Sequence, residues 1–199
     1  MTRYLAIEGV DGAGKSTVSA ALVERLGRTG RTVRLVREPG GTPVGESIRD
    51  LLLHGEDMAD WTEALLFAAQ RAQLAAEVIA PALERGEWVV SDRSYYSSLA
   101  YQGAARGLGV EAVRAVNEAG LDGVVPDLVV VLWVEPGEAL ARQDIVDRIG
   151  GVGEGFQAAV AKAYRHLAEE EPERVRLVDA SHSVDAIVAE IARLVEEGS

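Results

Sequence analysis

The chain has 199 residues, 48% of them apolar and 26% charged, a balance typical of one globular domain with a sizeable core. Its 20 Lys and Arg against 32 Asp and Glu give a net charge of −12, which disfavours binding to nucleic-acid polymers. The absence of cysteine excludes disulfides, thiolate metal sites and cysteine nucleophiles. No apolar run is long enough to span a membrane and no targeting segment is visible, so we expect a cytoplasmic protein.

Short apolar runs alternate with longer helical patterns along the chain. Strands are predicted at 4–9, 32–38, 88–92, 127–134 and 175–179, and the run DLVVVLWV at 127–134 is hydrophobic enough to be central. Helices are predicted at 15–28, 44–53, 61–85, 94–121 (broken near 103–109), 154–170 and 184–196. Because strands that alternate with helices form parallel sheets covered on both faces, the sequence predicts an α/β fold with a five-stranded parallel sheet. We expect a single domain over 1–199, with ligands at the carboxyl ends of the strands.

The segment EGVDGAGKST (8–17) lies between the first predicted strand and the first predicted helix. Gly9, Gly14, Lys15 and Ser16 match the pattern G-x-x-x-x-G-K-[ST] of a phosphate-binding loop, or P-loop. In such a loop the glycines let backbone N–H groups surround phosphates, the lysine adds a positive charge, and the hydroxyl can ligate Mg²⁺. A tight turn with a surface lysine is the alternative, but the flanking strand and helix favour a P-loop NTPase that binds ATP.

An acidic residue ends another apolar strand in the segment VVSDRS. Asp92 stands where the acidic group that holds Mg²⁺ through water is expected beside a phosphate-binding loop. The alternative is an aspartate that caps the following helix. Together with the phosphate-binding loop, the pattern favours the Mg²⁺ site.

Arginines at the ends of predicted elements indicate a second anionic ligand. Arg37 and Arg93 end or follow predicted strands, so both are expected at the edge of the sheet that carries the phosphate-binding loop. Arg49 and Arg71 lie in predicted helices. Guanidinium groups form forked hydrogen bonds that suit a phosphate or a carbonyl edge. Arginines scattered over the surface are the alternative.

Two pairs of side chains have the spacing of one helix face. Phe67 and Arg71 are spaced i, i+4, so a ring and a guanidinium could stack on a base and bond its edge. Taken alone, these residues favour a core phenylalanine and a solvated arginine. Ser97 and Tyr101 have the same spacing, and with Gln102 they could contact a sugar and a base. Polar residues on an exposed helix are the alternative.

Four segments together resemble the bacterial thymidylate kinase family. They are EGVDGAGKST, REPGGTP (37–43), ALLFAAQRAQ (64–73) and DRSYYSSLAYQG (92–103), which follow the family's order. The resemblance covers essentially the whole chain, and the last three segments are more specific than the phosphate-binding loop. It implies Mg²⁺-dependent phosphoryl transfer from ATP to dTMP, giving dTDP, in a homodimer formed through helices such as 61–85.

The resemblance also implies roles for individual residues. The donor side would comprise Gly9, Asp11, Gly12, Ala13, Gly14, Lys15, Ser16, Thr17 and Arg142. The acceptor side would comprise Arg37, Glu38, Pro39, Arg49, Phe67, Arg71, Arg93, Ser97, Tyr101 and Gln102. Arg37 and Arg93 would hold the dTMP phosphate, Phe67 would stack on thymine, Arg71 would bond its O4, and Tyr101 would disfavour a ribose 2′-OH. Ser16 and Asp92 would hold the metal, and Lys15, Arg93, Arg148 and Asp11 would act in catalysis.

One further positive charge is needed near the phosphoryl group that is transferred. In the family this arginine comes from the phosphate-binding loop or from a mobile lid, and the loop here has Gly12 and Ala13. We therefore expect a short lid at 138–155, in which Arg148 reaches the transferred group and Arg142 assists. The lid is less basic than usual, and the alternative is a surface pair of Arg148 with Asp144.

Three positions depart from the family pattern. Gln70 replaces the usual aspartate, Ser94 replaces an aromatic residue or histidine, and Trp133 replaces a common acidic residue. Two other functions therefore stay open. One is a P-loop kinase for another pyrimidine nucleotide, and the other is a non-catalytic nucleotide-binding module with a degenerate lid.

Overall fold

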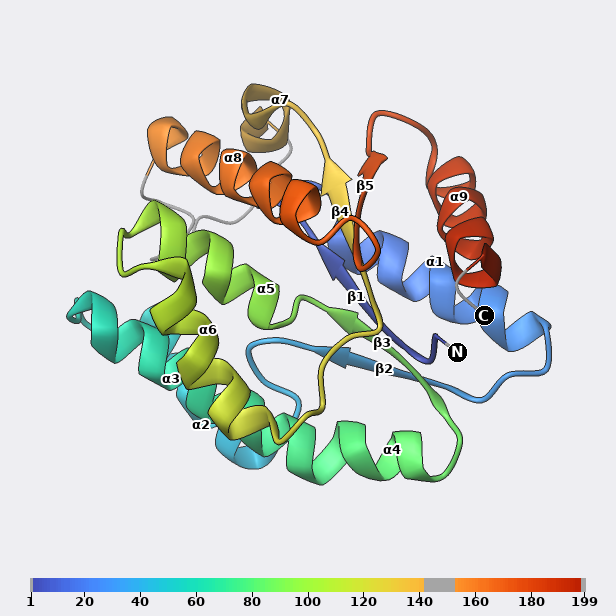
Figure 1. Cartoon of the computed structure of the whole chain (residues 1–199), viewed down its shortest axis with the longest axis horizontal. Helices are drawn as coiled ribbons and strands as arrows, with labels where there is room; N and C mark the ends of the chain where they lie inside the picture. The colour runs from blue at the N-terminus through green and yellow to red at the C-terminus, as the bar shows by residue number, and fades with distance from the viewer. Residues whose placement is uncertain (1, 142–152, 198–199) are drawn as a thin grey trace.

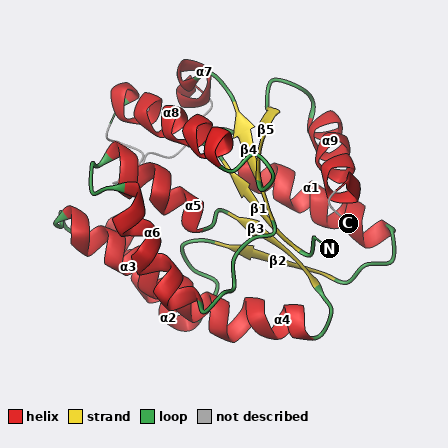
Figure 2. Ribbon diagram, in the orientation of Figure 1, coloured by secondary structure: helices red, strands yellow, loops and turns green. Residues whose placement is uncertain are grey.

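The computed structural model describes residues 2–141 and 153–197, in which a parallel sheet lies between layers of helices (Figure 1, Figure 2). The strands are β1 (Tyr4–Glu8), β2 (Val33–Arg37), β3 (Trp88–Asp92), β4 (Leu128–Trp133) and β5 (Val175–Asp179). They form one five-stranded sheet in the order β2-β3-β1-β4-β5, and every pair is parallel. The predicted fold is therefore confirmed. The central strand is β1 rather than the more hydrophobic β4, which lies beside it.

Helices cover both faces of this sheet. They are α1 (Lys15–Arg28), α2 (Pro43–His54), α3 (Asp60–Leu74), α4 (Ala80–Glu84), α5 (Tyr95–Ser98), α6 (Val110–Leu121), α7 (Pro136–Ala141), α8 (Glu154–Glu170) and α9 (Val184–Glu197). The helices α1 and α9 pack together on one side, α5, α6 and α8 lie on the other, and α2 to α4 lie beside the β2 end (Figure 1). Within the described ranges, no helix is long and apolar enough to cross a membrane.

The long helix predicted at 61–85 contains a widened turn. The π-helical segment η1 (Ala75–Ile79) separates α3 from α4, and the N–H of Ala80 donates to the carbonyl of Ala75. Pro81 follows directly, and a proline has no N–H to give and its ring crowds the preceding turn. A second π-helical segment, η2 (Leu99–Ala105), extends α5. The short helix α7 was not predicted, because residues 138–141 were assigned to the lid.

The register of the sheet places the ends of three strands side by side. Ile7 of β1 and Arg37 of β2 both pair with Asp92 of β3. The residues that follow β1 and β3 therefore leave the sheet at the same edge as Arg37. Since ligands of open parallel sheets bind at this edge, it is where a site is expected.

Candidate active site

The phosphate-binding loop connects β1 to α1, and the side chain of Lys15 folds back to bond the backbone at the start of the loop. Gly9, Gly12 and Gly14 have φ values of 140°, 82° and 87°, in the region that favours glycine. The Lys15 Nζ donates to the carbonyl oxygen of Val10 at 2.7 Å. Burial and the neighbouring positive charge of Arg93 lower the pKa of Lys15 to about 8. The ammonium group is thus held inside the loop, where a phosphate would bring it a counter-charge.

The helix α7 packs directly on this loop at Gly12. A Cβ atom added to Gly12 would lie 2.0 Å from the backbone oxygen of Ala139. The next residue, Ala13, is only 4% exposed. Positions 12 and 13, where a basic residue of the loop would stand, therefore have no room for a large side chain in this packing.

The predicted metal-binding residues lie together beside the loop. The Ser16 hydroxyl donates to Asp92 Oδ2 at 2.5 Å, which joins the start of α1 to the end of β3. Thr17 is exposed in the first turn of α1. The described residues contain no cluster of three or more His, Cys, Asp or Glu that could hold a metal ion. A cation at this position would thus need ligand oxygens in addition to those of Ser16 and Asp92.

Arg93 turns back from the end of β3 toward the phosphate-binding loop. Its φ of 73° is in the left-handed region, which is unusual for a residue with a side chain. The guanidinium donates to Asp11 and to Ser97 Oγ, the latter at 3.2 Å, and lies 5.3 Å from the centre of the Tyr101 ring. Burial by itself would raise the pKa of Asp11, but the positive charges of Arg93 and Lys15 hold that pKa below its usual value. Asp11 is therefore the anion between the two cations.

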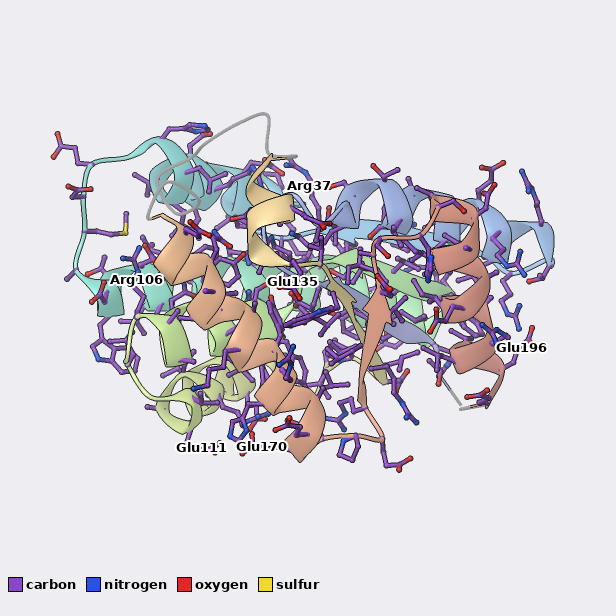
Figure 3. All side chains as sticks on the ribbon, turned by 90° about the horizontal axis from the view of Figure 1, so that it is seen from above. Arg37, Arg106, Glu111, Glu135, Glu170 and Glu196 are labelled. Atoms are coloured by element: carbon purple, nitrogen blue, oxygen red, sulfur yellow. The ribbon has the colours of Figure 1, made fainter. Side chains whose placement is uncertain are left out.

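The other arginines expected on the acceptor side lie further out. Arg37 donates to both carboxylate oxygens of Glu46 at 3.0 Å, and its side chain is half exposed (Figure 3). Arg49 donates to the carbonyl oxygen of Pro39 at 2.7 Å. The N–H of Gly41 also donates to Glu46, at 2.8 Å. The turn after β2 is thus held by contacts that leave Arg37 accessible to a ligand.

Arg71 is buried rather than solvated, which excludes the alternative of an exposed helix end. It is 2% exposed, and its Nε donates to Glu38 Oε2 at 2.5 Å. Its terminal nitrogens donate to Ser98 Oγ at 3.2 Å, to Asn117 Oδ1 and to the Ser94 carbonyl at 3.1 Å. Burial raises the pKa of Glu38 although Arg71 opposes the shift. Four of the five guanidinium N–H groups are engaged in these bonds, so one has no protein partner among the residues that the structure describes.

The remaining side chains of the expected base and sugar site lie on α3 and η2. Phe67 is partly buried against the core, and Tyr101 is 4% exposed. The Tyr101 hydroxyl is buried and has no hydrogen-bond partner within the described residues. The Gln102 amide nitrogen donates to Glu63 Oε1 at 2.9 Å. Glu63 also forms an ion pair with Arg106. Arg106 lies well apart from Arg37 (Figure 3). Glu63 therefore fixes which end of the Gln102 amide is a donor.

Some residues at this site were not predicted. Gln157 of α8 donates to Asp11 Oδ2 at 3.3 Å. Glu8 and Tyr164 form a buried cluster under the turn that follows β3. A glutamate that ends an apolar strand is a sequence signal for Glu8, whereas nothing local identifies Gln157 or Tyr164. Of the predicted lid, 138–141 end α7, Gly153 precedes α8 and 154–155 begin it, while Arg142 and Arg148 lie outside the described residues.

Comparison with known proteins decides the family. The family model described as thymidylate kinase matches residues 7–191. The chain belongs to the thymidylate kinase family. Similar proteins named thymidylate kinase come from Bifidobacterium longum strain NCC 2705 (44% identical, covering 98% of this chain and 97% of the relative) and Thiobacillus denitrificans (45%, 98% and 97%). A third, from Caldanaerobacter subterraneus, is 41% identical over 98% of this chain and 95% of the relative. The predicted family is therefore confirmed.

The three departures from the thymidylate kinase pattern have structural partners in this chain. The N–H of Gly40 donates to Gln70 Oε1 at 3.0 Å, and Ser94 donates to Glu8 Oε1 at 2.7 Å. The guanidinium of Arg165 lies 4.4 Å from the centre of the Trp133 ring. None of the three displaces Lys15 or Arg93 from the edge of the sheet described above.

Proposed function

We propose that this member of the thymidylate kinase family transfers the γ-phosphoryl group of ATP to dTMP, giving ADP and dTDP. The observation that carries the proposal is the turn of Arg93 toward the phosphate-binding loop, where Asp11 joins it to Lys15. A donor site for a triphosphate and a cation for a second phosphate thus lie within one cluster of side chains. Family membership supplies the identity of the nucleotides.

On the donor side, the glycine-rich loop and Lys15 would hold the ATP phosphates. Ser16 and Asp92 offer adjacent hard oxygen ligands, which suit Mg²⁺ together with phosphate oxygens and water. When bound, the ion neutralises charge on the phosphates. Thr17 lies in the first turn of α1, and its hydroxyl would add a further contact to the ATP phosphates.

On the acceptor side, Arg93 and Arg37 would hold the dTMP phosphate and Phe67 would stack on thymine. The one N–H of Arg71 left by its protein contacts is the donor we propose for thymine O4. The Tyr101 hydroxyl has no hydrogen-bond partner within the described residues, and the Arg93 guanidinium lies close to the Tyr101 ring. We propose that this hydroxyl contacts the sugar of dTMP.

The chemistry needs little beyond placement and charge. An oxygen of the dTMP phosphate, already an anion, attacks the γ-phosphorus, and the bond from that phosphorus to the ADP oxygen breaks. No proton has to leave the acceptor, so a general base is unnecessary. Lys15 and Arg93 reduce the repulsion between the two nucleotides, and we propose that Arg148, in a lid at 138–155 of this single domain, stabilises the transferred group.

A panel assay tests the function. ADP release is measured with ATP, Mg²⁺ and, in turn, dTMP, dUMP, dCMP, dGMP and UMP. We expect the highest kcat/KM with dTMP. An equal preference for another pyrimidine nucleotide would contradict the proposed substrate, and binding of ATP and dTMP without ADP release would favour the non-catalytic module instead.

The pKa of Lys15 predicts a pH dependence of ATP binding. The folded-state pKa of about 8 is below the usual value, so the ammonium is charged below pH 8 and loses its proton above it. We expect the Kd for ATP to be constant from pH 6.5 to 7.5 and to increase as the pH rises through 8 to 9. Calorimetry at several pH values measures this, and buffers of different ionisation enthalpy should reveal proton uptake on binding near pH 8. The Lys15→Met variant should lose both effects, and a Kd that is independent of pH in the wild type would contradict the assignment.

We also propose that the protein is a homodimer. Exposed apolar side chains lie on two helices that pack against each other: Leu51 of α2 is 54% exposed, and Trp61 and Leu65 of α3 are 40% and 51% exposed. Contact with a second copy would bury these side chains. The Leu65→Glu variant is therefore expected to be monomeric in light scattering at concentrations at which the wild type is dimeric. Leu177→Glu, an equivalent change on β5 at the opposite end of the sheet, should leave the dimer intact, and a monomeric wild type would overturn the proposal.

A further inference from the structure

Glu8, the last residue of the central strand, is completely buried. Its Oε1 accepts hydrogen bonds from the N–H of Ser94 at 2.7 Å, the hydroxyl of Ser94 at 2.7 Å and the N–H of Ser97 at 3.2 Å. Its Oε2 accepts from the hydroxyls of Ser97 at 2.6 Å and Tyr164 at 2.8 Å. No Lys or Arg within the described ranges forms an ion pair with it. Five neutral donors therefore hold one buried carboxylate.

Such a carboxylate is expensive to bury unless its oxygens are well hydrogen-bonded. Two of the donors here are backbone N–H groups at the start of α5, where such groups lack the usual helical partner, and the N–H of Ser97 also donates to the Ser94 carbonyl at 3.1 Å. The carboxylate of β1 thus satisfies the start of the helix that carries the acceptor side chains. The hydrogen bonds from those groups offset the free-energy cost of removing the carboxylate from water. The arrangement fixes the distance between the central strand and the start of α5.

The same contacts surround the unusual backbone of Arg93. Its N–H donates to the carbonyl of Ile7 at 2.9 Å, and its carbonyl accepts from the Ser91 hydroxyl at 2.5 Å. The next residue, Ser94, is held by Glu8 through both its N–H and its hydroxyl. A left-handed conformation at a residue with a side chain persists only where neighbouring contacts impose it. Glu8 supplies those contacts on the side of the turn that follows Arg93.

We propose that Glu8 is a positioning residue for the acceptor phosphate: it holds the 93–97 turn so that the Arg93 guanidinium faces the phosphate-binding loop. Ser97, which accepts from Arg93 at 3.2 Å, is itself held by Glu8, so both the backbone and the side chain of Arg93 depend on this carboxylate. The inference rests on the proposed function for the identity of the acceptor. Glu8 itself does not touch the substrate.

The Glu8→Gln variant tests the inference because it keeps the size of the side chain. An amide has one acceptor atom where the carboxylate has two, so the donors at Oε2 lose their partner. We expect the KM for dTMP to rise about tenfold and the kcat to fall, with the KM for ATP within about twofold of wild type. Tyr164→Phe and Ser94→Ala each remove one of the five hydrogen bonds to Glu8 and should raise the KM for dTMP by a smaller factor. Glu111→Gln, at an exposed position, is the matched control and should change neither constant.

A double-variant cycle with Arg93 separates positioning from general loss of structure. Arg93→Gly removes the guanidinium and accepts the positive φ without strain. If Glu8 acts through Arg93, adding Glu8→Gln to Arg93→Gly should change the KM for dTMP by less than about twofold. Equal effects of Glu8→Gln in both backgrounds would overturn the inference, as would an unchanged KM for dTMP in the single variant. If Glu8→Gln does not fold, Tyr164→Phe and Ser94→Ala decide: a KM unchanged in both would overturn the inference. A wild type that does not phosphorylate dTMP would instead contradict the proposed function.

Discussion

Replacement of Arg148 by alanine is expected to lower kcat by about 10³-fold, with dTMP and ATP still bound. The phosphate-binding loop contributes one lysine, Gly12 and Ala13 offer no charge, and Arg93, which is expected on the acceptor side, is already paired with Asp11. The charge that develops on the transferred group therefore needs a cation from another segment. Arg148 is the residue that the family resemblance assigns to it. Steady-state ADP release and separate measurements of ligand binding provide the test.

Two variants sharpen this experiment. Arg148→Lys keeps the charge without the forked geometry and should recover part of the kcat. Arg142→Ala should lower kcat less than Arg148→Ala, because Arg142 is expected only to assist. If Arg148 merely pairs with Asp144 on a helix surface, an interaction of about 0.3–0.5 kcal/mol, its removal would leave the turnover near normal. That outcome would contradict the catalytic assignment.

Arg71→Met is expected to lower the free energy of unfolding by about 3–5 kcal/mol, the usual consequence of breaking a buried ion pair on one side. Glu38 would keep its carboxylate at a site that is 5% exposed, without the Nε–H that now bonds it at 2.5 Å. The acceptors Ser98, Asn117 and the Ser94 carbonyl would lose their donor as well. Urea denaturation followed by circular dichroism measures the change.

The control is to remove both charges together. Arg71→Met with Glu38→Leu leaves no unpaired carboxylate, so the double variant should regain much of the lost stability. Arg28→Met removes an arginine whose pair with Glu24 is exposed, and it should change stability by no more than about 1 kcal/mol. A single Arg71→Met variant within about 1 kcal/mol of wild type would show that the buried pair is not holding the fold. Both Arg71 variants should bind dTMP poorly.

Local patterns were sufficient for the sheet and for the phosphate-binding loop. The strands are short apolar runs between turn residues, and Gly9, Gly14, Lys15 and Ser16 occupy fixed offsets within one segment, so both could be recognised without tertiary information. The widened turn before Pro81 was missed, because the same periodicity fits an uninterrupted helix. Element type is thus encoded locally, whereas the detailed helix geometry depends on single residues.

The environment of the acceptor residues could not be derived in the same way. Helix spacing alone favoured a solvated Arg71, but its partners come from positions 27, 33 and 46 residues away in the chain. Glu8 and Tyr164 meet although 156 positions separate them. Such contacts exist only after the sheet has brought β1 and α8 together. Family resemblance predicted the residues of the acceptor side, and only the fold shows which contacts hold them.

The close contact of Gly12 with α7 restricts how this chain could be altered. A thymidylate kinase that carries its arginine in the phosphate-binding loop is not one substitution away, because any Cβ at position 12 meets the Ala139 carbonyl and the backbone there has a positive φ. Grafting that arginine would require α7 to be rebuilt first. A single substitution, natural or engineered, therefore cannot place the catalytic cation at position 12. Selection for turnover should act instead on the basic residues of the segment that follows α7.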